Sequence, residues 1–121
     1  MILVTKLKNE IMKELPNAEF DLRNISVNGE KRGCSGFIIN DGVIVYVNTE
    51  KPVLGGLGLM FQYARYEKDY KGLQNKWVTT GEKDYITAII GALKDKKGYE
   101  REMEHDRIMR EKRSQKHELG L

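Results

Sequence analysis

The sequence predicts an α+β fold: a helix, a three-stranded antiparallel meander, then two helices and a charged helical C-terminal tail. Two observations support this class. The spacing of apolar residues is helical before Pro16, strand-like after it, and helical again in the second half. Two turn signals, Asn28-Gly29 and Asn40-Asp41-Gly42, separate runs rich in β-branched residues. They are typical of hairpins, because Gly and Asn tolerate the positive φ of tight turns.

The first helix is expected from residue 3 to residue 15. Apolar residues recur there at steps of three and four, with charged residues between them: Val4, Leu7, Ile11 and Leu15. This spacing is typical of an amphipathic helix. Pro16 ends the helix, because proline lacks a backbone donor and disfavours helical angles at the residue before it.

The meander is expected to begin with two pairs of alternating apolar residues, Phe20 with Leu22 and Ile25 with Val27. The odd spacing between these pairs predicts a bulge or a short break, because an unbroken strand would place them on opposite faces. The second and third strands are expected at Cys34–Ile39 and Val43–Val47, which are rich in β-branched residues.

Two further helices are expected after the meander. On the first, steps of about 100° gather four apolar residues on one side and three tyrosines nearly opposite. These are Leu57, Met60, Phe61 and Ala64, and Tyr63, Tyr66 and Tyr70. The second helix is expected to start at a capping box formed by Thr79 and Glu82. Its apolar stripe is Ile86, Ile89, Ile90 and Leu93.

Length and composition restrict the class of protein. The 121 residues fit one α+β domain, 1–97, followed by a charged helical tail, 98–121. A net charge of +3 leaves protein and nucleic-acid partners both open, because DNA coats are usually far more basic and DNA mimics far more acidic. A single cysteine excludes an internal disulfide, and neither a secretory signal nor a membrane-spanning run of about 20 apolar residues is recognisable. The expected location is the cytoplasm.

No pattern of residues indicates catalysis, a metal or a cofactor. The glycines at 55, 56 and 58 lack the dinucleotide fingerprint and the lysine of a phosphate loop. His105 and His117 both lie in the tail, far in sequence from Cys34, and show no zinc-type spacing. Cys34 is expected to be buried and inert. The sequence therefore predicts a protein that is not an enzyme.

The residues from Phe61 to Trp77, called here the aromatic-basic segment, are the first candidate for partner binding. They combine rigid aromatic rings with basic residues, a mixture favoured at protein interfaces and able to contact nucleic acid. The candidate residues are Tyr63, Tyr66, Tyr70, Lys71, Lys76 and Trp77. For Tyr63 and Tyr66, packing against another helix is an equal alternative. The tail supplies a second candidate surface, at Arg107, Arg110 and Arg113, or is simply a solvated helix.

The stretch from Lys68 to Trp77, preceded by Met60 and Tyr63-Ala64-Arg65, resembles small accessory proteins of conjugative elements and phages in Gram-positive bacteria. The predicted element order is also similar to that of a small inhibitor of Cas9-type nucleases. The resemblance implies a type II-A anti-CRISPR that binds a defence nuclease or its ribonucleoprotein. That inhibitor is an acidic DNA mimic, whereas this chain is slightly basic, so a different route is implied: the guide RNA, the heteroduplex channel or a nuclease domain.

Two functions are therefore expected as alternatives. The first is a non-enzymatic protein that binds and blocks a nuclease of bacterial defence. The second is a small nucleic-acid-binding protein that uses the aromatic-basic segment and the tail.

Overall fold

The structure of the chain, a computed structural model, describes residues 1–50, 59–65, 77–79 and 81–118. Within these ranges a helix, an antiparallel sheet and two further helices follow one another, which confirms the predicted α+β class. The helices are α1 (Val4–Glu14), α2 (Glu82–Lys94) and α3 (Lys96–Glu118). The strands are β1 (Glu19–Val27), β2 (Glu30–Asn40), β3 (Val43–Asn48), β4 (Leu59–Tyr63) and β5 (Trp77–Thr79).

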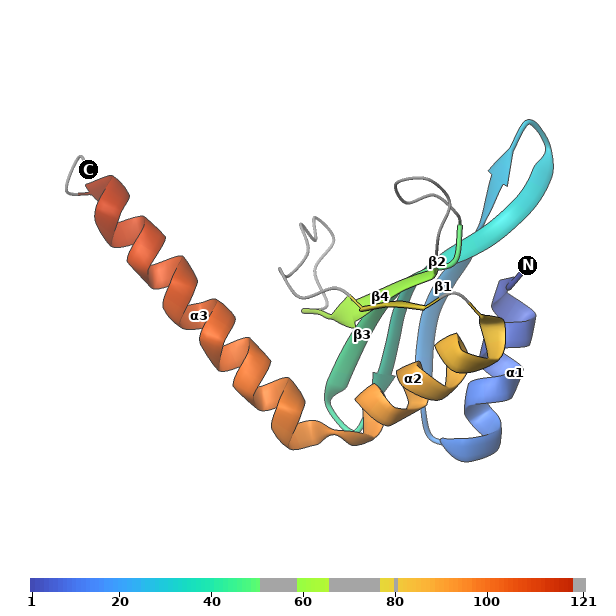
Figure 1. Cartoon of the computed structure of the whole chain (residues 1–121), viewed down its shortest axis with the longest axis horizontal. Helices are drawn as coiled ribbons and strands as arrows, with labels where there is room; N and C mark the ends of the chain where they lie inside the picture. The colour runs from blue at the N-terminus through green and yellow to red at the C-terminus, as the bar shows by residue number, and fades with distance from the viewer. Residues whose placement is uncertain (51–58, 66–76, 80, 119–121) are drawn as a thin grey trace.

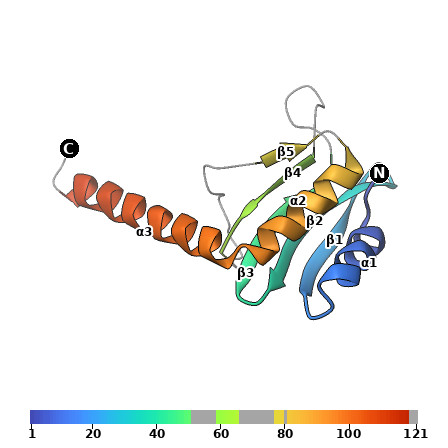
Figure 2. The same ribbon diagram turned by 60° about the horizontal axis from the view of Figure 1, so that its bottom comes forward.

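The elements form two layers and a projecting arm (Figures 1 and 2). The described strands make one antiparallel sheet in the order β1-β2-β3-β4-β5. Helices α1 and α2 lie side by side against one face of this sheet. Helix α3 starts at the end of α2 and extends away from both layers (Figure 1).

The predicted first helix and three-stranded meander are confirmed. Asn28 and Gly29 have φ of 53° and 83°, and Asp41 and Gly42 have φ of 48° and 79°. Both hairpin turns thus use consecutive residues with positive φ, as the sequence predicted. An irregularity is present, but not between Leu22 and Ile25 as predicted: the pairing with β2 is continuous from Glu19 to Ile25 and shifts between Ile25 and Ser26.

The predicted helix that follows the meander is wrong where the structure describes it, because Leu59–Tyr63 form strand β4. The chain here pairs with β3. Alternation directs Phe61 and Tyr63 toward the helices and Met60 and Gln62 to the other side. Pairing with β4 satisfies the second edge of β3, and aromatic residues suit strands. The sheet therefore has five described strands instead of the three predicted.

Helix α2 corresponds to the predicted later helix, but its start differs. Thr79 is the last residue of β5, and the N-cap is Gly81, without a side-chain hydrogen bond. The predicted capping box between Thr79 and Glu82 is therefore wrong. Its buried face is also rotated about the helix axis from the predicted one: Tyr85, Ile89 and Leu93 are fully buried, whereas Ile86 and Ile90 are only partly covered.

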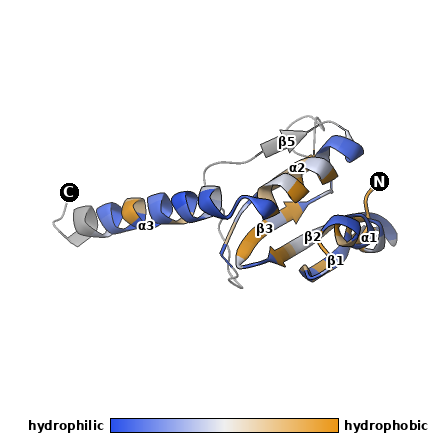
Figure 3. Cartoon of the chain, turned by 90° about the horizontal axis from the view of Figure 1, so that it is seen from below, coloured by the Kyte–Doolittle hydropathy of each residue, from blue (hydrophilic) through white to orange (hydrophobic). Residues whose placement is uncertain are grey.

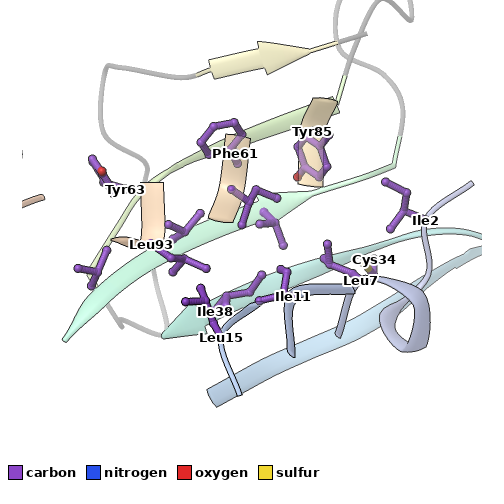
Figure 4. Packing of buried hydrophobic residues seen from close by; sticks show 14 residues of the cluster. Ile2, Leu7, Ile11, Leu15, Cys34, Ile38, Phe61, Tyr63, Tyr85 and Leu93 are labelled. Atoms are coloured by element: carbon purple, nitrogen blue, oxygen red, sulfur yellow. The ribbon is translucent and has the colours of Figure 1, made fainter. Parts of the chain in front are cut away.

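The core lies between the sheet and the pair α1 and α2. Figure 3 shows hydrophobic residues on the sheet and α2 where they approach each other, and a mostly hydrophilic α3. The side chains labelled in Figure 4 fill this layer. Tyr85 is the largest fully buried residue within the described ranges, and its hydroxyl donates to the Met60 carbonyl at 2.5 Å. Its ring meets Phe61 edge-on at 5.8 Å between centroids.

Candidate partner-binding surface

Helix α3 is the most exposed of the three described helices. At about 1.5 Å per residue, its 23 residues extend about 35 Å. Between residues 96 and 114 most side chains are exposed, and the partly covered residues are Gly98, Tyr99, Glu102, Met103 and Asp106. The spacing of Tyr99, Met103 and Asp106 places them on one face of the helix. This face is the side that approaches the sheet.

Tyr99 attaches the start of α3 to the end of β4. Its hydroxyl donates to the carbonyl of the buried Ala64 at 2.8 Å. Its ring meets that of Tyr63 at 5.3 Å between centroids, with 69° between the planes. Burial raises the pKa of Tyr99 above its usual value, partly offset by Arg65, so the hydroxyl stays a donor at neutral pH. The helix is therefore fixed to the sheet at its first turn.

Asp106 adds a second attachment two turns further along. Its Oδ2 lies 3.0 Å from an Arg65 guanidinium nitrogen and 3.0 Å from Nε of Arg110. The Asp106 side chain is only 13% exposed. Neither arginine is aligned as a hydrogen-bond donor to this oxygen, so both contacts are ion pairs. Arg65, two residues after the end of β4, thereby couples the sheet to the middle of α3.

Tyr63 does not belong to an exposed surface. It is 5% exposed, and its hydroxyl donates to the Ala92 carbonyl at 3.0 Å. Burial, with the nearby carboxylates of Asp95 and Glu102, raises its pKa to about 12. As a partner-binding residue Tyr63 is a wrong prediction, because the strand that replaces the predicted helix turns this ring into the core. Packing was the alternative that the sequence left open.

Beyond Arg65, the structure describes the aromatic-basic segment only at its last residue, Trp77. Tyr66, Tyr70, Lys71 and Lys76 lie outside the described residues, so their role stays a prediction. Trp77 lies on β5, where its backbone pairs opposite Phe61. The start of this segment contacts the tail, because Tyr63 meets the ring of Tyr99 and Arg65 pairs with Asp106.

The three predicted tail arginines differ in their surroundings. Arg107 pairs with Glu104 and Glu111, each at 2.6 Å, and these carboxylates raise its pKa. Arg110 pairs with Asp106, as described above. The Nε of Arg113 donates to the Met109 carbonyl at 3.4 Å. Arg107 and Arg110 therefore already have acidic partners within α3.

Sequence reasoning missed the role of Tyr99, Met103 and Asp106. Met103, like Tyr99, packs against the edge of the core. Their spacing of four and three residues was a signal, because it gives one helix face within a segment that is otherwise charged. Because strand β4 was not predicted, the sequence did not show what this face packs against.

Cys34 is buried, as predicted. Burial raises the pKa of its thiol, which disfavours the reactive thiolate, and the Thr49 hydroxyl lies 3.7 Å from the sulfur. Among the described residues, no three His, Cys, Asp or Glu side chains gather as potential metal ligands. None of the helices in the described part of the chain has the length and apolar character needed to cross a membrane.

Comparison with known proteins found no matching family model, no matching curated protein and no matching solved structure. The surface must therefore be interpreted from its own residues.

Replacing Tyr99 with phenylalanine is expected to lower the free energy of unfolding by about 1 kcal/mol, because the Ala64 carbonyl loses its donor while the ring contact stays. Chemical denaturation followed by circular dichroism measures this loss. Met12→Leu, at an exposed apolar position of α1, is the control and should change stability by less than about 0.5 kcal/mol. An unchanged stability in Tyr99→Phe would show that this hydroxyl does not hold α3.

Proposed function

We propose that this chain is a non-enzymatic binding protein that presents helix α3 to a macromolecular partner. The observation that carries the proposal is the combination of exposure and attachment in α3. Most of its described side chains are exposed, yet Tyr99 and Asp106 fix its direction relative to the sheet. A binding element held in place before docking loses less conformational entropy when it docks.

The resemblance of residues 68–77 suggests the partner. We take it to be a Cas9-type nuclease of bacterial defence, or its complex with guide RNA and DNA, which the protein would block on behalf of a mobile genetic element. The net charge of +3 argues against mimicry of DNA and is compatible with docking on either the protein or the nucleic acid of such a complex. Residues Tyr70, Lys71, Lys76 and Trp77 stay part of the proposed surface.

A chain that ends after Tyr99 tests the proposal. It keeps the Tyr99 contacts with β4 and removes the exposed part of α3. We expect inhibition of DNA cleavage by a Cas9-type nuclease to weaken at least about tenfold, because interface energy is concentrated in few residues. Cooperative thermal unfolding should be kept.

Three outcomes contradict the proposal in different ways. If the full chain does not inhibit cleavage, the nuclease is the wrong partner. If the shortened chain inhibits as well as the full chain, α3 is not the binding element. If the shortened chain no longer unfolds cooperatively, α3 is a structural element of the domain.

A further inference from the structure

The side of α3 that faces away from the sheet carries basic residues without acidic partners. Lys97, Arg101 and Lys112 are all exposed. Within the described ranges none of them forms an ion pair, in contrast to Arg107 and Arg110 on the same helix. Free cations attract anions more strongly than cations already neutralised by a neighbouring carboxylate.

These residues share one face of the helix. Lys97, Arg101, His105, Ile108 and Lys112 follow one another at steps of four, four, three and four, the spacing of neighbours along a helix face. The first four line the same shallow hollow on the helix surface, with Glu100 and Glu104 beside them. Of these two carboxylates, Glu104 is paired with Arg107. We call Lys97, Arg101 and Lys112 the outer basic stripe.

The stripe lies opposite the attached face. Each of its members is two positions from Tyr99, Met103 or Arg110 on the inner face, a rotation of about 200° around the helix axis. The contacts of Tyr99 and Asp106 with the sheet therefore point the stripe into solvent. A large flat partner can approach it without meeting the rest of the domain (Figure 1).

We infer that the outer basic stripe binds the phosphate backbone of a nucleic-acid duplex. This rests on the proposed role of α3 and specifies what it contacts. Charge complementarity selects a polyanion. The face that holds the stripe carries no Phe, Tyr or Trp ring, the side chains on which single-stranded bases usually stack, so a duplex is the better match. Contacts to phosphate alone carry no sequence information, and the binding is therefore independent of sequence.

Titration of the full-length protein with a fluorescent DNA duplex at several salt concentrations tests the inference. Three phosphate contacts predict that log affinity falls by about 2.7 per tenfold rise in salt. Changing Lys97, Arg101 and Lys112 together to glutamine should weaken binding at low salt at least about tenfold and remove most of this dependence. Glutamine keeps helix propensity, so circular dichroism should not change.

A matched variant controls for net charge. Changing Arg23, Lys31 and Lys83 to glutamine also removes one arginine and two lysines, at exposed positions away from α3. It should bind the duplex within about threefold of the unchanged protein, because it loses only long-range attraction. Equal losses in both triple variants would overturn the inference.

Other ligands separate the alternatives. An RNA duplex should bind about as well as DNA, because only phosphates are contacted, whereas the single strand should bind more weakly. Absence of duplex binding at low salt, or tighter binding to polyglutamate than to the duplex, would overturn the inference and point to an acidic protein surface. Nuclease inhibition without duplex binding would leave the proposed function standing and remove this inference alone. Duplex binding without nuclease inhibition would support this inference and remove the nuclease as the proposed partner.

Discussion

Replacing Gly36 with alanine is expected to destabilise the protein by about 3–5 kcal/mol, and to lower the melting temperature by about 10 °C or more. Gly36 lies within β2, opposite Leu22 of β1, with a φ of 141°. A Cβ at this position would lie 2.0 Å from the Asp21 carbonyl oxygen and 2.9 Å from the Leu22 Cα. Backbone atoms cannot rotate away as a side chain can, so β1 would have to move.

Gly91 provides a matched control in the same chain. It lies exposed within α2, and a Cβ there would meet no atom within 4 Å. Gly91→Ala should stabilise the protein by up to about 1 kcal/mol, because alanine favours the helix. Thermal unfolding of both variants measures the contrast. A Gly36→Ala protein as stable as the unchanged chain would mean that β1 and β2 do not approach each other as described.

Local signals in the sequence were sufficient for the first half of the fold. The helix that ends before Pro16 and both hairpin turns depend on neighbours within a few residues. Neither needed knowledge of a distant partner. The irregularity in β1 was located less well: the apolar pairs Phe20 with Leu22 and Ile25 with Val27 indicated a break before Ile25, whereas the pairing with β2 shifts after Ile25.

Strand β4 could not be predicted in this way. The apolar residues of its neighbourhood fit a helical face and a strand face about equally over so short a run. The decision comes from β3, whose residues Val43, Val45 and Val47 are buried and whose second edge requires a partner. This is an override of local pattern by tertiary pairing, and it moved Tyr63 from a predicted surface into the core.

The candidate surface was predicted in part. The sequence indicated that the tail is helical and basic toward its end, and the structure has α3 there. Which cations are free depends on side-chain geometry: Arg107 lies between two carboxylates, and Asp106 is shared by Arg65 and Arg110. Arg65 is distant in sequence from Asp106, so no local pattern could reveal that contact.

Replacing Thr49 with valine is expected to cost about 2–4 kcal/mol, a large effect for the loss of one hydroxyl group. Thr49 follows β3 and is 4% exposed. Its Oγ1 accepts a hydrogen bond from the Cys34 amide at 2.8 Å and donates one to the Ile2 carbonyl at 2.7 Å. This single oxygen thus ties the segment before α1 to β2 and to the end of β3.

Valine keeps the shape of threonine but leaves two buried backbone groups without this partner, at about 1–3 kcal/mol for each unsatisfied group. Serine keeps the hydroxyl and loses one methyl group, which costs about 1 kcal/mol. Equilibrium denaturation should therefore rank the unchanged chain above Thr49→Ser and Thr49→Ser above Thr49→Val. The opposite order would show that Thr49 contributes through the packing of its methyl group, because only then would the variant with the larger apolar side chain be the more stable one.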